Sequence, residues 1–448
     1  MKKNKRKRII PHGWKEIKIS DVFETSSGST PTASKQEYYE NGDIPWINSG
    51  ELAKPYIYRT NNFITKEGYD NSSTKMYPID TVLVAMYGAT AGKASILKME
   101  ACTNQAVCAI LPNPDYDPLF IKYSIDTLYD YLVGLSTGSA RDNLSQAGIK
   151  DLKLIVPNSL KEQKQLASVL ATLDKKITLN RQINDNLEAM AKQLYDYWFV
   201  QFDFPNEEGK PYKSSGGAMV WNEKLKREIP QGWHCGTLLD IAEYTNGLAC
   251  QKYRPTDNNK LPVIKIKEMH DGLSADTEWV KVDIPDDVKV FDGDVLFSWS
   301  ASLEVMLWAY GNGGLNQHIF KVTSKNGYPR SFYFYQLFHY VGVFKQMAEA
   351  RKTTMGHITQ DHLRQSTIAL PPNVDIANRL EENLCPIFDE IVKNNQENMA
   401  LTKQRDELLP LLMNGQASVN YHLSFGILFV YLFLYSQNMK YIWQQKIY

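Results

Sequence analysis

Cysteine is scarce in this chain, and the few cysteines show no pairing pattern. The 448 residues include five cysteines, and no two of them are spaced as C-x-x-C. An odd number without such a pair excludes a disulfide framework and a cysteine-based zinc site. We therefore expect reduced, mostly buried thiols of a cytoplasmic protein at Cys102, Cys108, Cys235, Cys250 and Cys385.

The chain also lacks an excess of charge of one sign and an apolar run of membrane length. Its 50 Lys and Arg balance 50 Asp and Glu, which disfavours a general polycation but allows basic side chains gathered on one face. The basic start, MKKNKRKR, has no apolar stretch for a secretory signal and is either an arm on nucleic acid or a solvated tail. The apolar run Phe425–Tyr435 is shorter than the roughly 18 residues of a membrane span, so a short docking strand or helix is expected there.

Motifs for catalysis are missing as well. YGATAGKAS (87–95) is one residue short of a Walker loop and has Ala94 where a Mg²⁺ ligand should stand, so it is interpreted as a Gly-rich turn. Asn113–Tyr116 departs from the Asn/Asp-Pro-Pro-Tyr/Phe loop of amino-methyltransferases and is also interpreted as a turn. His357 and His362 lack acidic or Cys partners at ligand spacing. We therefore expect no catalytic residue, no metal site and no cofactor bound by this chain.

What the sequence does contain is an internal repeat. Three pairs of segments match: IPHGW (10–14) with IPQGW (229–233), IDTVLVAMYGAT (79–90) with FDGDVLFSWSAS (291–302), and IVPN (155–158) with LPPN (370–373). Each copy has mixed strand and helix signals followed by a long helical stretch, so two similar domains are expected. The second copy has no counterpart of Gly88, Gly92 or Lys93, which excludes a phosphate cradle common to both copies.

The two helical stretches carry a seven-residue repeat. Its positions are Leu166, Leu173, Asn180, Leu187 and Leu194 in the first stretch, and Leu380, Ile387, Asn394, Leu401 and Leu408 in the second. The companion d positions of the first stretch are assigned to Val169, Ile183, Met190 and Tyr197, with Lys176 as the exception. Because Asn180 and Asn394 occupy the central heptads, we expect the helices to pair through a polar layer that fixes their register. Two helices packed separately on their own domains are the alternative, and Pro386 must either kink or begin the second helix.

Polar and aromatic residues gather in loop-like segments of both copies. The chain has 26 Tyr and 9 Trp, an inventory typical of interfaces. Ser, Thr, Asn, Gln, Lys and aromatic side chains are also the groups that contact phosphates and base edges. The candidate DNA contacts are Ser27, Ser29, Thr30, Lys35, Tyr87, Thr90, Lys93, Ser139, Arg141, Lys252, Tyr253, Arg254, Lys265, Lys267, Trp299, Arg351, Lys352 and Thr353. For any single residue a solvated loop or a turn cap is the alternative, and Asn104 and Asn316 are interpreted as turn residues of a shared scaffold.

In this order, the segments resemble the specificity subunits of Type I restriction–modification systems. The resemblance is carried by IPHGW and IPQGW, GSTP (28–31), DIPWINSGEL (43–52), EQKQLASVLATLDKKITLNRQ (162–182), YDYWFVQFDFP (195–205) and LLPLLMNGQ (408–416). It implies an α+β chain with two mixed α/β target recognition domains, each reading one half of a split double-stranded DNA sequence. Two long helices forming an antiparallel coiled coil would join the domains. The resemblance also implies two methyltransferase subunits that bind S-adenosylmethionine, and restriction subunits that use ATP and Mg²⁺.

The repeat and the resemblance together give a domain plan. It comprises a first recognition domain (10–158), a first spacer helix (159–204), a linker (205–228), a second recognition domain (229–373), a second spacer helix (374–416) and a tail of uncertain role (417–448). Trp198 and Phe199 are candidate contacts with the methyltransferase subunits, and packing at the helix end is the alternative. The tail from about Tyr421 onward departs from the family pattern.

Three functions can be separated by simple observations. A DNA-reading subunit predicts salt-sensitive DNA binding that sharpens when methyltransferase subunits are present. A self-contained methyltransferase or nuclease would bind S-adenosylmethionine or turn over DNA alone. A scaffold that binds only protein would not be retained on DNA at any salt concentration. The sequence favours the first function.

Overall fold

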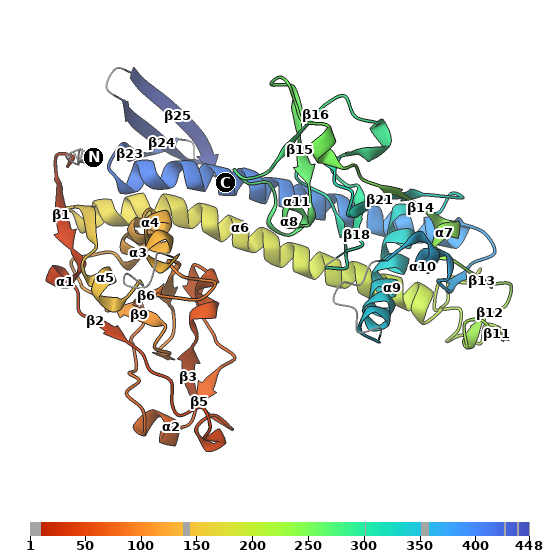
Figure 1. Cartoon of the computed structure of the whole chain (residues 1–448), viewed down its shortest axis with the longest axis horizontal. Coiled ribbons are helices and arrows are strands. Elements are labelled where there is room, and N and C mark those ends of the chain that lie inside the picture. Colours follow the sequence, from red (N-terminus) through yellow and green to blue (C-terminus); the bar gives the residue numbers. More distant parts are fainter. Residues whose placement is uncertain are drawn as a thin grey trace. The chain divides into compact units, whose positions relative to one another are not determined.

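The chain divides into two compact units. The computed structural model describes residues 10–137, 144–300, 302–350, 358–424, 427–436 and 439–447. Unit 1 consists of Met1–Lys175 with Thr402–Tyr448, and unit 2 consists of Lys176–Leu401. The helices α6 (Leu160–Tyr195) and α11 (Asp375–Met413) each contribute residues to both units (Figure 1). Each unit therefore contains one sequence repeat and the helical segments that pack on it.

Unit 1 is built on a five-stranded sheet with the order β2-β9-β6-β7-β4. These strands are β2 (Thr25–Ser27), β9 (Val107–Ile110), β6 (Val82–Ala85), β7 (Ala94–Leu97) and β4 (Tyr56–Ile57). All four residues of β6 are buried, as expected for a central strand that is covered on both faces. The remaining strands are β5 (Phe63–Ile64), β3 (Ile44–Ile47) and β8 (Cys102–Thr103) in a second sheet, and β1 (Trp14–Lys18) paired with β10 (Lys153–Pro157).

Short helices cover the sheets of unit 1 and join them to α6. They are α1 (Ile19–Val22), η1 (Gln36–Tyr38), η2 (Ser49–Ala53), α2 (Lys66–Asp70), α3 (Pro118–Asp126), α4 (Tyr129–Thr137) and α5 (Gln146–Lys150). α3 begins after Asp117, whose side chain accepts a hydrogen bond from the Phe120 amide, and has Pro118 at its first position. The Asp117 amide donates to Oε1 of Gln163 at 2.9 Å, so the start of α3 is attached to α6 (Figure 1).

Unit 2 repeats this plan, with one longer helix, α9. Its main sheet has the order β14 (Ala242–Asn246), β21 (Ile319–Ser324), β18 (Val295–Ser298) and β19 (Glu304–Leu307). The second sheet has the order β16 (Trp279–Lys281), β15 (Lys260–Ile264), β20 (Gly313–Leu315) and β17 (Lys289–Val290). The other strand pairs are β11 (Met219–Asn222) with β12 (Arg227–Pro230), and β13 (His234–Gly236) with β22 (Ile368–Leu370). The helices are η3 (Asp196–Val200), α7 (Leu238–Ile241), η4 (Cys250–Lys252), α8 (Ile266–Asp271), η5 (Asp286–Val288), α9 (Arg330–Ala350) and α10 (Gln360–Arg364).

The strand pairing confirms the internal repeat. In unit 1, Ile47 of β3 pairs in parallel with Thr103 of β8, and in unit 2, Ile264 of β15 pairs in parallel with Leu315 of β20. The amide of Asn104 donates to the Ile47 carbonyl at 3.0 Å, and the amide of Asn316 donates to the Ile264 carbonyl at 3.0 Å. Both asparagines therefore hold the same turn, as interpreted from their equal positions in the two copies.

The buried face of α6 differs from the predicted heptad assignment. Leu166, Leu173, Asn180 and the assigned d residue Val169 are buried as expected, but most of the buried companion residues lie four residues after the heptad positions instead of three. These companions are Leu170, Ile177, Asn184 and Ala191. The assigned d residues Ile183 and Met190 are 44% and 58% exposed. Since a helix turns once in 3.6 residues, spacings of three and four both continue a stripe, and the exposed Lys176 lies beside the buried Ile177 where the two spacings diverge.

A polar layer pairs α6 with α11 inside unit 2. Nδ2 of Asn394 donates to Oδ1 of Asn184 at 2.9 Å, while Nδ2 of Asn184 donates to the Ile391 carbonyl at 3.2 Å. Nδ2 of Asn180 donates to Oε2 of Glu397 at 2.6 Å. Residues further along α6 thus meet residues further back along α11, so the helices pair antiparallel, as expected. Asn180 and Asn394 are both buried, but they bond to different partners and not to each other.

The second long helix passes through its proline. α11 starts at Asp375, eleven residues before Pro386, so the prediction that Pro386 could begin the helix is wrong. Pro386 lies on the exposed side of α11, where the missing N–H leaves the helix ladder interrupted only next to solvent. The linker predicted at 205–228 also contains more order than a connector, because β11 and the start of β12 form a hairpin there.

Trp198 and Phe199 pack inside unit 2, which corrects their assignment as partner contacts. Both lie in the π-helical turn η3 and are 8% and 4% exposed. Phe199 contacts Phe332 edge-on with ring centroids 4.9 Å apart and lies 6.0 Å from Trp233 of the second IPQGW motif. The helix-end alternative therefore describes these side chains, which the unit uses for its own aromatic core.

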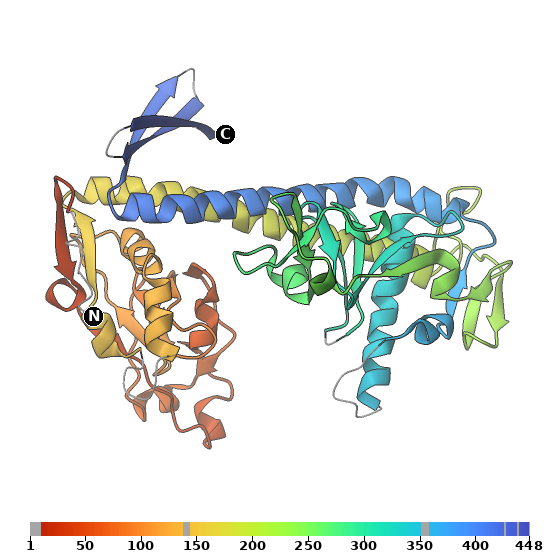
Figure 2. The ribbon, with the colours of Figure 1, turned by 45° about the horizontal axis from the view of Figure 1, so that its top comes forward.

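The C-terminal segment forms a three-stranded antiparallel sheet. Its strands are β23 (Ala417–Ser424), β24 (Ile427–Ser436) and β25 (Met439–Ile447), with β24 in the middle (Figure 2). Most of the apolar run seen in the sequence lies in β24, so of the two predicted forms the strand is confirmed. In the described part of the chain, no helix has the length and hydrophobicity needed to cross a membrane.

Candidate nucleic-acid interface

Three polar loops that are far apart in the sequence meet in unit 1. They follow β2 (28–35), β6 (86–92) and β8 (104–106). The Ser29 amide donates to the Thr103 carbonyl at 3.0 Å, and the Thr30 hydroxyl donates to the side-chain oxygen of Gln105. The Met86 amide donates to the Ala106 carbonyl at 2.8 Å, which attaches the second loop to the third. We call this set the three-loop surface of unit 1.

Unit 2 has the corresponding three-loop surface after β14, β18 and β20. Nε1 of Trp299 donates to Oδ1 of Asn246 at 3.0 Å, and the Trp299 ring lies 5.5 Å from the ring of His318. The Gln317 amide donates to the Leu248 carbonyl at 2.9 Å, and its side chain contacts the His318 ring at 3.3 Å. Segments 246–254, 298–300 and 316–318, which contain the candidates Lys252, Tyr253, Arg254 and Trp299, are therefore neighbours in space.

A glycine allows the first loop to approach the third in each unit. A Cβ atom on Gly28 would lie 1.9 Å from the carbonyl oxygen of Thr103, and one on Gly247 would lie 2.2 Å from the carbonyl oxygen of Asn316. No side chain fits at such a distance from the backbone, so the close approach itself requires glycine at both positions. The two surfaces thus share one backbone design and differ in the side chains that they present.

The structure places most of the candidate contacts of unit 1 on or beside this surface. Ser27, Ser29 and Thr30 are half-buried, and Tyr87 is 47% exposed. Other candidates have local partners: Nζ of Lys35 donates to the Tyr38 hydroxyl at 2.8 Å, and the Thr90 hydroxyl donates to the Ser49 carbonyl at 2.7 Å. Thr90 is therefore a turn cap as well as a candidate contact, which was the alternative given for single residues.

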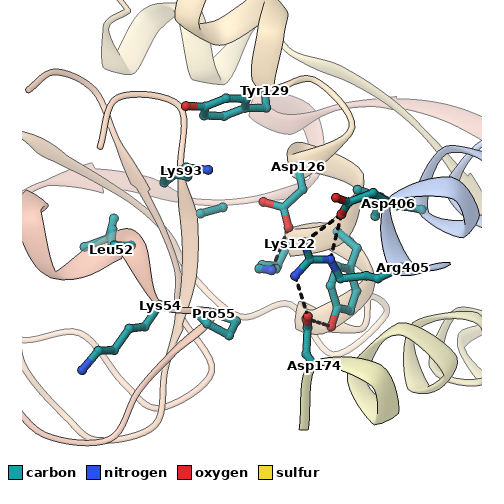
Figure 3. Close-up of a pocket in the computed structure, with 14 residues that line it drawn as sticks. Leu52, Lys54, Pro55, Lys93, Lys122, Asp126, Tyr129, Asp174, Arg405 and Asp406 are labelled. Atoms are coloured by element: carbon teal, nitrogen blue, oxygen red, sulfur yellow. Dashed lines mark hydrogen bonds and ion pairs between the residues drawn. The ribbon is translucent and has the colours of Figure 1, made fainter. Parts of the chain in front are cut away.

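Lys93 belongs to a different part of unit 1. Its Nζ lies 4.1 Å from the ring centroid of Tyr129, on α4, and it lines a cavity of about 340 Å³. Figure 3 shows Lys93 and Tyr129 on one side of this cavity and Asp174 with Arg405 on the other, while Lys54 points away from the acidic residues. The two ends of YGATAGK therefore lie in different environments. Tyr87 is exposed near the three-loop surface, and Lys93 lines the cavity.

The basic candidates of unit 2 fall into two groups. Lys252 and Arg254 are exposed beside η4, and Tyr253 is half-buried with Nζ of Lys281 5.5 Å from its ring centroid. Lys265 forms an ion pair with Glu278, and Lys267 lies 3.8 Å from Asp276. The hydrogen bond and the charge of Lys265 lower the pKa of Glu278, so this carboxylate competes with any phosphate for Lys265.

Five candidates fall outside the residues that the structure describes. They are Ser139 and Arg141 in the first copy, and Arg351, Lys352 and Thr353 in the second.

The cavity of unit 1 is lined by two groups of paired charges. The Tyr123 hydroxyl donates to Asp174 at 2.6 Å, and Nη1 of Arg405 donates to the other oxygen of Asp174 at 3.0 Å. Arg405 also bonds to Asp406 at 2.7 Å, and Lys122 pairs with Asp126 at 2.7 Å (Figure 3). Burial raises the pKa of the Asp126 carboxyl, although the charge of Lys122 opposes this shift. For Arg405, burial lowers the pKa, but the bonds with Asp406 and Asp174 outweigh it, so the pKa is raised. Sequence analysis missed this set because its members lie in three separate segments.

The described residues offer no group of three or more His, Cys, Asp and Glu side chains that could hold a metal ion. All five cysteines are free thiols, three of them buried. Burial raises the pKa of Cys102 to about 11 and that of Cys108 to about 12. Such thiols stay protonated at neutral pH, so they act as apolar core residues rather than as nucleophiles.

Comparison with known proteins identifies the family. The family model described as "Type I restriction modification DNA specificity domain" matches residues 11–189 and 230–397. The chain belongs to this family. The two matches correspond to the two sequence repeats, so the recognition domain is present twice, and the chain is a Type I specificity protein and not a catalytic subunit.

Individual relatives agree with this assignment. The chain is 29% identical over 426 residues to the Type I restriction enzyme MjaIX specificity subunit of Methanocaldococcus jannaschii, covering 92% of this chain and 95% of that protein. It is 26% identical to the EcoR124I/EcoR124II specificity subunit of Escherichia coli, over 44% of this chain and 49% of that protein. The crystal structure of the Type I S subunit from M. genitalium has the same fold, with a TM-score of 0.56 at 14% identity, covering 91% of this chain and 98% of that one.

Proposed function

We propose that each unit reads one half of a two-part double-stranded DNA target through its three-loop surface. One observation carries this proposal: the two surfaces have the same backbone arrangement but present different polar side chains. Unit 1 presents Thr30 with Gln105, whereas unit 2 presents Trp299 with Asn246 and His318. Amide and hydroxyl groups held rigidly at a surface are suited to base edges and phosphates, and different sets suit different sequences.

The proposal assigns catalysis to other subunits. Two methyltransferase subunits would bind S-adenosylmethionine, and restriction subunits would use ATP and Mg²⁺, while this chain supplies the sequence specificity. Support comes from the family and from the relatives, which are named as specificity subunits. With DNA as the target and its cysteines unpaired, the chain would work in the cytoplasm.

An apolar stripe on α6 supports a docking site for a methyltransferase subunit in unit 2. Leu179 and Ile183 are each 44% exposed, and Met190 is 58% exposed. Their spacing of four and seven residues places them on one face of the helix, beside the seam that packs on α11. Exposed apolar side chains on one helix face are suited to a partner helix, so this stripe replaces Trp198 and Phe199 as the proposed contact.

The function is tested by mapping methylated adenines in the genome of the host with and without this gene. Loss of methylation at one asymmetric two-part motif is the expected result, and it would give both half-sites at once. Unchanged methylation would contradict the proposal if the purified complex with methyltransferase subunits also failed to bind DNA containing such a motif.

The docking site is tested by co-purification with methyltransferase subunits. The variants Ile183→Asp and Met190→Asp should reduce recovery of the complex about tenfold or more, because a charge would replace a desolvated apolar contact. Ala189→Asp is the matched control, since Ala189 is also exposed on α6 but lies about 100° around the helix from Met190. Equal loss in all three variants would show that the helix, and not the stripe, had been damaged.

A further inference from the structure

The recognition domain of unit 1 meets its helices through the charged set that lines the cavity. We call Tyr123, Asp174 and Arg405 the junction network. Tyr123 lies on α3 and is 1% exposed, Asp174 lies on α6 and is 5% exposed, and Arg405 lies on α11. One Asp174 oxygen accepts from Tyr123 and the other accepts from Arg405, so a single carboxylate connects three elements (Figure 3).

In unit 2, apolar side chains stand at the positions equivalent to Asp174 and Arg405, and other bonds hold α9 to α11: Nη2 of Arg330 donates to Asp389 at 2.8 Å, and the Ser331 amide donates to Glu381 at 2.9 Å. The alignment that places Phe120 on Phe332, both fully buried, places Tyr123 on Tyr335. The helix repeat that places Asn180 on Asn394 places Asp174 on Phe388 and Arg405 on Ala191. Phe388 lies 5.9 Å from the ring of Tyr335, and Ala191 is fully buried in the same aromatic core. The tyrosine is thus present in both junctions: its hydroxyl donates to a carboxylate in unit 1, and its ring packs near Phe388 in unit 2.

The two junctions constrain the recognition domain differently. The contact between Tyr335 and Phe388 depends little on direction, and the directional bonds between α9 and α11 lie elsewhere, at Arg330 and Ser331. A hydrogen bond from Tyr123 to a buried carboxylate that is also held by Arg405 is directional and fixes both distance and angle. The charges that line the cavity are largely paired with one another, through Arg405 with Asp174 and Asp406 and through Lys122 with Asp126, which favours a mechanical role over a ligand site.

We propose that Arg405 and Asp174 are positioning residues for DNA reading by unit 1, acting through Tyr123 to fix the orientation of the recognition domain on its helices. Neither residue is part of the three-loop surface, so their effect on DNA is indirect. This inference rests on the proposed function, because orientation matters only if the domain reads DNA. It predicts that the two half-sites respond differently to changes at equivalent positions of the two units.

The test measures half-site discrimination by the complex with methyltransferase subunits. The dissociation constant is determined for the cognate duplex and for two duplexes that each carry one substitution in one half of the target. Tyr123→Phe should reduce discrimination at one half about three- to tenfold and leave the other half unchanged, because it removes one charge-assisted hydrogen bond. Phe388→Ala removes the ring that packs on Tyr335 in unit 2, so it should reduce discrimination at the other half of the target.

Matched variants separate positioning from simple loss of stability. Tyr335→Phe removes the hydroxyl at the equivalent position of unit 2 and should leave both halves unchanged. Arg405→Ala should act like Tyr123→Phe, and Arg405→Lys should restore part of the discrimination because it keeps a cation beside Asp174. If Arg405→Ala fails to fold, Asp174→Phe combined with Arg405→Ala reproduces the residues of unit 2 and restores a packed junction.

The outcomes distinguish this inference from the proposed function. If the wild-type complex discriminates both halves and Tyr123→Phe changes neither, or changes both equally, the positioning role is wrong. If the wild-type complex shows no discrimination, the proposed function itself has failed.

Discussion

At the scale of single residues, the glycines at the three-loop surfaces are the most constrained positions. Gly28→Ala and Gly247→Ala should each destabilise the protein by about 2–4 kcal/mol, because the added methyl group overlaps a backbone carbonyl that cannot move without breaking strand pairing. Thermal unfolding measures this effect. Gly50→Ala is the control, since a Cβ at Gly50 meets nothing within 4 Å. A Gly28→Ala protein as stable as Gly50→Ala would contradict the close approach.

The buried cysteines give a prediction for alkaline pH. Burial raises the pKa of Cys108 from 9.0 to about 12, so the folded protein holds this proton more tightly than the unfolded chain. Its stabilising contribution is therefore complete below pH 9.0 and is lost as the pH rises from 9.0 towards about 12. Urea unfolding at stepped pH should show a smaller loss of unfolding free energy for Cys108→Ala, and an unchanged loss would contradict the prediction.

In native protein, thiol reagents should modify half-buried Cys235 and Cys385 before Cys102, Cys108 and Cys250.

At the scale of elements, the polar layer decides how α6 and α11 pair in unit 2. Asn184→Ala should destabilise this unit by about 2–3 kcal/mol, because the buried Asn394 amide loses its acceptor. Asn186→Ala, at an exposed position of α6, is the matched control and should change stability by less than about 0.5 kcal/mol. Chemical unfolding followed by helix circular dichroism measures both. Equal effects would show that the layer contributes only helix propensity.

The helices also show where pattern reading succeeds and where it fails. The seven-residue repeat predicted both long helices, their approximate ends and the buried position of Asn180. It placed Val169 correctly but misassigned Ile183 and Met190, because spacings of three and four residues both stay close to the 3.6-residue turn. In the structure Ile183 and Met190 are surface residues, while Asn184 and Ile177 lie in the buried seam. Only the position of the partner helix distinguishes the two spacings.

At the scale of the whole molecule, DNA binding should depend on salt through exposed basic residues such as Lys252 and Arg254. For the complex with methyltransferase subunits, Lys252→Ala and Arg254→Ala should each reduce the slope of log K against log salt by about 0.9, the value for one phosphate contact. Lys265→Ala should reduce it less, because Glu278 already balances that charge. Binding titrations over a series of salt concentrations give the slopes. Lys224→Ala, an exposed lysine of the β11–β12 turn, should leave the slope unchanged.

The sequence by itself determined the architecture of this protein. Two copies of one pattern, IPHGW through IVPN and IPQGW through LPPN, require two similar domains, because equal side-chain patterns bury equal surfaces. The same comparison predicted the turn role of Asn104 and Asn316, and the heptads predicted paired helices. These features depend on local spacing, which a sequence displays directly.

Tertiary structure alone decided what the individual side chains do. The sequence suggests that Trp198 and Phe199 are exposed, but both are buried, and Phe199 packs against Phe332 of α9. Lys93 packs on Tyr129, away from the exposed turn that precedes it, and Asp174 bonds to Arg405, more than 200 residues away in the sequence. Long-range partners of this kind depend on how elements pack in three dimensions, and neither periodicity nor composition carries that information.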